Sequence, residues 1–212
     1  CKANTRAILE VIREMESQHA KLMVLPELCI TGYTCQDLFL QRRLLDSAWE
    51  SLLTIAEETA DVDALIFVGL PMRMNGKLYN VAASLNHGNI LGFVPKTHIP
   101  NYNEFYEQRH FASGADVWTD VTVGEESVPF GSNLIFSCES LPEFTVGAEI
   151  CEDLWVPLPP SVNLAQSGAH IIVNLSASDE MVGKDSYRRD LVKGQSARLV
   201  CGYIYATAGE GE

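Results

Sequence analysis

The sequence predicts an α/β fold in one domain, and three observations support this expectation. Helical patterns with apolar residues at three- and four-residue spacing alternate with short apolar runs that are typical of buried strands. The chain has 212 residues, of which 47% are hydrophobic, and this is enough for one sizeable core. Internal repeats, low-complexity tracts and linker-like segments are absent from the sequence. We therefore expect one domain over residues 1–212.

Three amphipathic patterns predict helices. Asn4 is expected to cap the first helix, in which apolar residues recur at helical spacing as far as Met15. The same spacing predicts helices over residues 44–60 and 186–200. Within the last of these, the adjacent Arg188 and Arg189 are expected on a solvated helix face.

Short apolar runs predict the strands between these helices. Pro26 stops the first run, and the turn residues Asn86-His87-Gly88 predict a hairpin. Residues 95–131 are long, polar and aromatic with weak periodicity, so we expect a functional loop there. The expected strands cover residues 21–25, 64–70, 78–85, 89–94, 133–138, 144–148, 169–175 and 201–206.

Charge and cysteine content restrict the class of protein. The net charge of -13 argues against binding a nucleic acid or an anionic membrane, because both require a basic surface. Six cysteines are spread along the chain without a secreted disulfide framework, which favours reduced thiols and a cytoplasmic protein. No apolar run approaches the roughly 20 residues of a membrane helix. The chain starts as a helix begins and stops just after a strand, so we expect it to be truncated at both ends.

Ionisable residues follow three of the expected strands. Glu27, Lys96 and Cys151 each lie where a strand ends, and ligand sites of α/β folds form at such strand ends. Acidic neighbours of Cys151 raise its pKa, so a reactive thiol here needs a base and a cation from elsewhere in the chain. Glu27 can supply the base and Lys96 the cation. The three residues together therefore predict nucleophilic catalysis by a cysteine.

Each of these residues alone has a simpler interpretation. Glu27 could be a solvated turn carboxylate, Lys96 a surface lysine and Cys151 an inert buried thiol. Their joint occurrence favours the catalytic interpretation. Near the cysteine, Asp153 could simply cap the residues that follow, and Trp155 is expected to pack rather than to stack on substrate.

Other kinds of site have weaker support. A Cys-His pair would need His98, His110 or His170, but none has a third orienting residue at a recognisable spacing. Spacings typical of metal ligands, such as CxxC or HxxxH, are absent, so no metal site is expected. Residues 209–212 are too short and too acidic to hold a phosphate, so the chain is not expected to bind ATP.

The three segments resemble the Glu-Lys-Cys signatures of the carbon-nitrogen hydrolase (nitrilase-like) superfamily. They are most similar to its branch of glutaminase domains of glutamine-dependent NAD synthetases. The resemblance covers nearly the whole chain in the family's order, and three motifs with the intervening strands make it specific. The similar segments are Pro26-Glu27-Leu28 with Thr31-Gly32-Tyr33, Lys96 with residues 100–111, residues 149–155 and residues 203–212.

The resemblance implies a four-layer αββα sandwich and a mechanism. Glu27 would be the general base, and Cys151 would attack the amide carbon of glutamine to form a thioester. Lys96 and the backbone N–H of Glu152 would stabilise the oxyanion. The family often has a second glutamate that orients the lysine. Supporting residues implied in this way are Glu104 as that glutamate, with Glu107 as the competing candidate, and Tyr102 and Ser178 near the glutamine substrate.

The resemblance also implies partners. Ammonia would pass to a synthetase domain of the same polypeptide, absent from this chain, which would use ATP, Mg²⁺ and deamido-NAD. This domain itself would need no cofactor and would assemble as a homo-oligomer. Two alternatives remain: a free-standing amidase or carbamoylase with the same three residues, and a structural or regulatory module with a vestigial site. The intact Glu27, Lys96 and Cys151 count against the second alternative.

Overall fold

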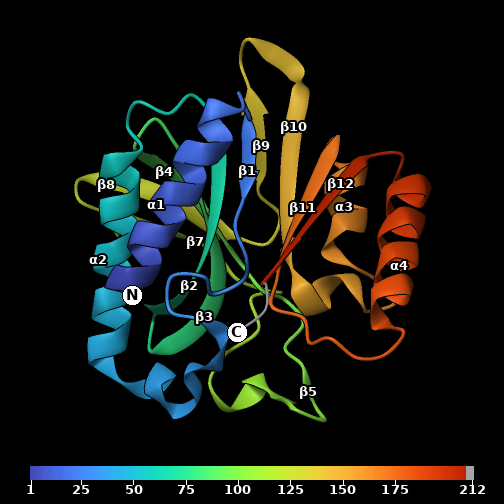
Figure 1. Ribbon diagram of the computed structural model, residues 1–212, viewed down its shortest axis with the longest axis horizontal. Helices are drawn as coiled ribbons and strands as arrows, with labels where there is room; N and C mark the ends of the chain where they lie inside the picture. Colours follow the sequence, from blue (N-terminus) through green and yellow to red (C-terminus); the bar gives the residue numbers. More distant parts are fainter. Residues whose placement is uncertain (209–212) are drawn as a thin grey trace.

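Two sheets packed between two layers of helices form the structure, a computed structural model that describes residues 1–208 (Figure 1). Helices α1 (Lys2–Ser17) and α2 (Arg42–Glu58) cover the outer face of the first sheet. Helices α3 (Pro160–Gln166) and α4 (Lys184–Leu199) cover the outer face of the second sheet. The four-layer αββα sandwich implied by the resemblance is therefore confirmed.

The described residues form a first sheet of six strands in the order β1-β2-β3-β4-β8-β7. β1 pairs with β2 in parallel, while β2, β3 and β4 form an antiparallel meander. His87 and Gly88, both with positive φ, make the tight turn of the predicted hairpin between β3 and β4. The strands are β1 (Leu22–Val24), β2 (Leu65–Met74), β3 (Lys77–Asn86), β4 (Asn89–Pro95), β7 (Trp118–Val123) and β8 (Glu126–Gly131).

The second sheet has the order β12-β11-β10-β9 within the described part of the chain. β10, β11 and β12 are parallel neighbours, and β9 is antiparallel to β10. The carboxyl ends of the three parallel strands therefore lie at one edge. The strands are β9 (Ile135–Cys138), β10 (Leu141–Ile150), β11 (Ile171–Ser176) and β12 (Gly202–Thr207).

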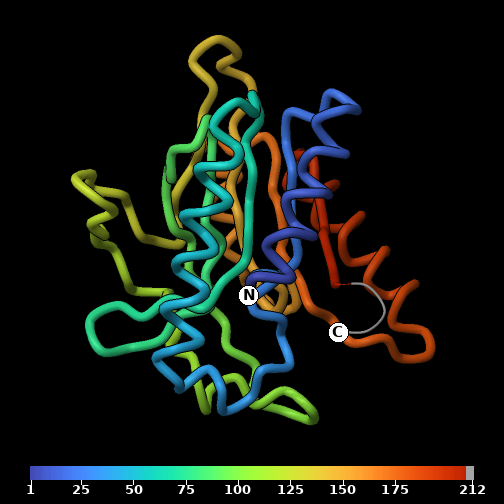
Figure 2. The backbone as a smooth tube through the Cα atoms, turned by 60° about the vertical axis from the view of Figure 1, so that its left-hand side comes forward, coloured from blue at the N-terminus to red at the C-terminus, as the bar shows by residue number. Residues whose placement is uncertain are grey.

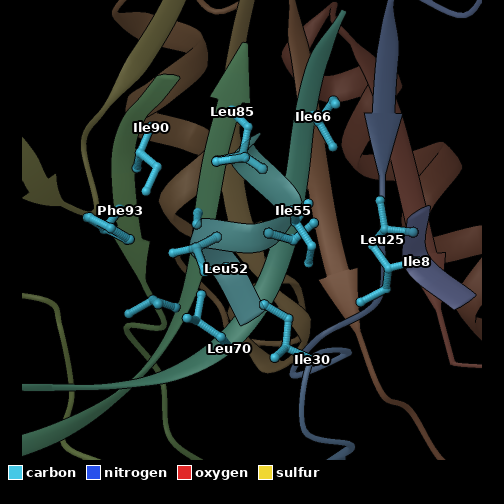
Figure 3. Packing of buried hydrophobic residues seen from close by; sticks show 14 of the residues in the cluster. Ile8, Leu25, Ile30, Leu52, Ile55, Ile66, Leu70, Leu85, Ile90 and Phe93 are labelled. Carbon is cyan, nitrogen blue, oxygen red and sulfur yellow. The ribbon is translucent and has the colours of Figure 1, made fainter. Parts of the chain in front are cut away.

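Two apolar layers hold the sandwich together. Between α1, α2 and the first sheet lies a large cluster in which Leu52 and Ile55 of α2 face Leu70 and Leu85 of the sheet (Figure 3). Between the two sheets, Phe67 of β2 packs in one cluster with side chains of β10 and β11. The sandwich therefore buries both faces of the first sheet.

Among the described residues, no helix is both long and apolar enough to span a bilayer.

The segment 95–131, expected to be one long loop, is partly regular, and that expectation is wrong. It contains the short strands β5 (Asn101–Tyr102) and β6 (Phe105–Tyr106), the turn η2 (Glu107–Arg109) and the hairpin β7–β8 (Figure 2). β8 joins the first sheet beside β4, where Phe93 pairs with Phe130. Exposed and half-buried positions alternate from Trp118 to Val123, as in a strand. The sequence shows this alternation only in part, because the apolar Trp118 falls on the exposed face.

Two smaller expectations need correction. Asn4 lies inside α1, which begins at Lys2, and its side-chain amide donates to the carbonyl oxygens of Cys29 and Ile30. Arg188 of α4 is buried rather than solvated. Outside the segment 95–131, three further elements were not expected from the sequence: α3 and the 3₁₀ helices η1 (Tyr33–Leu40) and η3 (Cys151–Leu154).

Candidate active site

The ends of β1, β4 and β10 bring together the three residues that the sequence singled out. Glu27 follows β1, Lys96 follows β4, and Cys151 follows β10 directly. The first two residues belong to one sheet and the third to the other, so the site lies across the junction between the sheets. All three side chains are buried.

The Glu27 carboxylate is held by three donors. Its Oε1 accepts hydrogen bonds from Lys96 Nζ at 2.7 Å and from Asn80 Nδ2 at 2.6 Å, and its Oε2 accepts one from the N–H of Ala177 at 3.0 Å. A buried carboxylate with donors on both oxygens, one of them charged, has a fixed orientation. Asn80 was not predicted from the sequence, because it lies within the apolar β3 strand.

The Glu27 turn depends on a glycine of the neighbouring strand. A Cβ atom at Gly69 of β2 would lie 2.4 Å from Leu28 N and 2.7 Å from Pro26 O, both backbone atoms. A side chain there would collide with the turn. Gly69 therefore lets the chain cross β2 closely enough to place Glu27 in the site.

Lys96 lies between two carboxylates. Its Nζ donates to Glu27 Oε1 at 2.7 Å and to Glu107 Oε1 and Oε2 at 2.7 and 3.0 Å. Burial acts to lower the pKa of Lys96, but the charges of Glu27 and Glu107 raise it well above its ordinary value, so the ammonium stays charged. Glu107 also accepts a hydrogen bond from the Tyr33 hydroxyl at 2.7 Å.

The glutamate beside Lys96 is Glu107, and the choice of Glu104 is corrected. The β5–β6 hairpin leaves Glu104 exposed on the surface, and the turn η2 that follows directs Glu107 inward, where it is 6% exposed. Burial raises the pKa of Glu107, and the Lys96 charge opposes this shift. The Lys96 ammonium compensates the two carboxylates in part, which is what allows them to be buried so close together.

Cys151 has an unusual backbone conformation. Its φ is 45°, in the left-handed region, which costs a residue other than glycine about 1–3 kcal/mol. Its N–H donates to Asn174 Oδ1 at 3.0 Å, and Asn174 Nδ2 lies 3.5 Å from its carbonyl oxygen. Because its own N–H is occupied, the next backbone donor along the chain is the N–H of Glu152.

The Cys151 thiol is protonated at rest. Burial raises the pKa of the thiol above its ordinary value, and the Glu27 charge adds to this, while Lys96 and Ser176 oppose it. The Ser176 hydroxyl donates to Sγ at 3.2 Å. A thiol of this kind needs a base to become a nucleophile.

Asp153 connects the nucleophile turn to the lysine segment. Its Oδ1 accepts hydrogen bonds from the N–H groups of Thr97 and His98 and from the Thr97 hydroxyl, at 3.1, 2.7 and 2.6 Å. Its Oδ2 accepts one from the N–H of Ile150 at 3.1 Å. Asp153 therefore does more than cap its own turn, since it fixes the distance between the segments that carry Lys96 and Cys151.

A cavity of about 360 Å³ opens onto Cys151. Tyr102 donates its hydroxyl proton to Glu152 Oε2 at 2.8 Å on its wall. Lys184, paired with Asp179, lies over the rings of Phe105 and Trp155. Trp155 packs against Tyr187, as expected, but it also lines this cavity. The other predicted residues on the wall are Ser178 and Glu104.

Arg188 positions the loop that carries Ser178. It donates to Ser178 Oγ at 3.3 Å, to the Asp179 carbonyl at 3.1 Å and to Glu180 Oε1 at 2.7 Å. This role could not be predicted from the sequence, because adjacent arginines on a helix are usually solvated.

The three histidines considered for a Cys-His pair all bond to other residues. Within the described part of the chain, His98 contacts Asp153, His110 contacts Asp37 and His170 contacts Thr145. No group of three metal-binding side chains occurs among residues 1–208. The segment 209–212, considered for phosphate, lies outside the described residues.

Curated proteins with similar sequences are glutamine-dependent NAD(+) synthetases. The protein of Mycobacterium tuberculosis is 41% identical over 210 residues, covering 99% of this chain and 31% of that protein. The protein of Thermotoga maritima is 31% identical over 214 residues, covering 100% of this chain and 34% of that protein. The chain therefore spans about a third of the length of these relatives.

Solved structures agree with this relationship. A glutamine-dependent NAD(+) synthetase from Cytophaga hutchinsonii superposes with a TM-score of 0.85 at 34% identity, covering 96% of this chain and 33% of that one. An amidase from Nesterenkonia sp. AN1 has the same fold, with a TM-score of 0.72 at 18% identity and coverage of 97% and 72%. The family model of carbon-nitrogen hydrolases matches residues 2–207. The chain belongs to the carbon-nitrogen hydrolase family.

Proposed function

We propose that the chain is the glutamine amidohydrolase domain of a glutamine-dependent NAD synthetase, and that it hydrolyses the side-chain amide of glutamine to glutamate and ammonia. One observation carries this proposal. The Lys96 ammonium is buried between Glu27 and Glu107, at strand ends that also present the Cys151 thiol. A cation fixed in a buried site can stabilise an oxyanion at little reorganisation cost.

The mechanism starts from the buried, protonated thiol of Cys151, which needs a base to become a nucleophile. Glu27 takes the proton from the Cys151 thiol as Sγ attacks the amide carbon. Lys96 Nζ and the Glu152 N–H stabilise the resulting oxyanion. Glu27 then returns the proton to the leaving nitrogen, the C–N bond breaks, and ammonia leaves a thioester on Cys151. A water molecule that gives its proton to Glu27 hydrolyses the thioester, releasing glutamate and the thiol.

The cavity supports an amino-acid substrate. Lys184 and Glu152 place a cation and an anion on its wall, and the α-carboxylate and α-ammonium groups of glutamine carry the opposite charges. Tyr102 and Ser178 lie on the same wall and are the proposed polar contacts of the substrate. A simple aliphatic amide has no charged groups that could contact Lys184 and Glu152, which favours glutamine.

The proposal extends to the whole protein. The similar synthetases are about three times as long as this chain, which supports a synthetase domain in the same polypeptide. That domain would bind ATP, Mg²⁺ and deamido-NAD and would consume the ammonia. We also propose a cytoplasmic homo-oligomer, with no cofactor in this domain.

Ammonia release from glutamine tests the proposal. In the full-length polypeptide, Cys151→Ala is expected to lower the rate at least about 10³-fold, and Lys96→Ala about 10²-fold or more. Circular dichroism would check that both variants fold. The exposed Leu141, far from the cavity, provides the control variant Leu141→Ala, which should release ammonia at the wild-type rate.

Two results would contradict the proposal. Glutaminase activity retained by Cys151→Ala would exclude the mechanism. A wild type that hydrolyses short aliphatic amides or N-carbamoyl compounds far better than glutamine would instead identify a free-standing amidase or carbamoylase.

A further inference from the structure

A chain of hydrogen bonds runs behind Cys151 in one direction. The Cys151 N–H donates to Asn174 Oδ1 at 3.0 Å, Asn174 Nδ2 donates to the Tyr203 hydroxyl oxygen at 3.1 Å, and the Tyr203 hydroxyl donates to Glu149 Oε1. The chain ends on a carboxylate whose other oxygen accepts the N–H of Ser161 at 2.8 Å. Along this series each donor points from Cys151 toward Glu149, while Asn174 Nδ2 also lies 3.5 Å from the Cys151 carbonyl oxygen.

The direction of these hydrogen bonds determines how the Asn174 amide is oriented. An asparagine amide has nearly the same shape after a 180° rotation about its Cβ–Cγ bond. Here that rotation would place Nδ2, a donor, against the N–H of Cys151, which is also a donor. The Tyr203 hydroxyl gives its proton to Glu149, so it presents a lone pair to Asn174 Nδ2. Tyr203 therefore reinforces the amide orientation that leaves Oδ1 for the Cys151 N–H and places Nδ2 near the Cys151 carbonyl oxygen.

The three partners come from three neighbouring strands. Glu149 on β10 is the register partner of Asn174 on β11, and Tyr203 on β12 reaches across β11 to both. Glu149 and Asn174 are fully buried, so water cannot replace a lost partner easily. The hydrogen bonds of these buried groups end at Cys151, the residue whose backbone is in the left-handed conformation.

We propose that Tyr203 is a positioning residue, which acts through Asn174 to hold the backbone of Cys151 in its left-handed conformation. This orientation points Sγ toward the substrate and leaves the Glu152 N–H available to the oxyanion. The inference rests on the proposed function for its activity measurement.

The variant Tyr203→Phe of the full-length polypeptide tests the positioning role of Tyr203, because this change removes one hydroxyl and keeps the ring. We expect kcat to fall about 10- to 100-fold and KM to stay within about threefold. Glutamine binding measured calorimetrically in a Cys151→Ala background should be unchanged by the added Tyr203→Phe. Tyr79→Phe is the matched control, since this buried tyrosine packs on Phe130 in the other sheet, and it should leave kcat unchanged.

A double variant tests whether Tyr203 acts through Asn174. Tyr203→Phe combined with Asn174→Ala, or with Asn174→Ser if the alanine variant does not fold, should lose little more activity than the Asn174 variant alone. Wild-type kcat in Tyr203→Phe, or losses that multiply in the double variant, would overturn the inference. An inactive wild type with glutamine would instead refute the proposed function.

Discussion

At the scale of single residues, the reacting groups depend on buried partners: Glu107 holds Lys96, and Asn174 and Ser176 contact Cys151. Glu27, Lys96 and Cys151 each follow a recognisable strand, and the structure brings them into one site. Ser176, Asn174 and Tyr203 look like strand residues in the sequence. The contacts of Ser176 and Asn174 with Cys151, and of Tyr203 with Asn174, arise only from the register of β10, β11 and β12. Such register cannot be read from one sequence, because it depends on which strands become neighbours.

The two candidate glutamates give a residue-scale prediction. Glu107→Gln removes one of the two carboxylate charges that hold the Lys96 ammonium. We expect kcat to fall about 10- to 100-fold, because Glu27 is then the only carboxylate of this pair that still orients the ammonium. Glu104→Gln is the matched comparison, since Glu104 is exposed and makes no hydrogen bond or ion pair with Lys96 among the described residues; we expect a much smaller change. Steady-state glutaminase assays on both variants show which of the two glutamates supports Lys96. A larger loss in Glu104→Gln would reverse the assignment.

At the scale of elements, placement at strand ends could be predicted, and the local turns could not. The apolar runs located β1, β4 and β10, and with them the residues that follow these strands. The β5–β6 hairpin and turn η2 consist of a few residues each, too short for a period to be detected. The family resemblance therefore implied Glu104, although the chain turns inward at Glu107.

The crossing of the Glu27 turn over β2 gives an element-scale prediction. Gly69→Ala should destabilise the fold by about 1–3 kcal/mol, since the new methyl group meets backbone atoms that cannot move independently. It should also lower kcat, because the displaced turn carries Glu27. Urea unfolding and the glutaminase assay measure the two effects.

The same substitution in α4 is the control for Gly69→Ala. Gly194 has no atom within 4 Å of its Cβ position among the described residues, so Gly194→Ala should raise stability by about 0.5–1 kcal/mol. Equal effects of the two substitutions would show that the close approach at Gly69 has no role.

At the scale of the whole molecule, the buried acids link stability to pH. Burial raises the pKa of Glu149 from 4.5 to about 7, and hydrogen bonds from Tyr203 and Ser161 offset this only in part. The folded chain therefore holds this proton more tightly than the unfolded chain between these pH values. Raising the pH from about 4.5 to 7 should lower the free energy of unfolding, by about 3 kcal/mol from this group.

Glu149→Gln tests this link, because a glutamine does not titrate. Measured by urea unfolding at pH 5 and pH 8, the stability of the variant relative to wild type should rise by about 3 kcal/mol at the higher pH. Glu139→Gln, at an exposed position, should follow the wild-type pH dependence. A difference between Glu149→Gln and wild type that does not change with pH would contradict the prediction.

The division of the site between two sheets has a consequence for folding. Glu27 and Lys96 come from the first sheet and Cys151 from the second, so neither sheet alone holds a base beside the thiol. A nascent or partly unfolded chain thus carries only an ordinary cysteine with no means of attacking amides. Hydrolytic competence therefore requires the two sheets to be packed on each other, and local unfolding that separates them would abolish it.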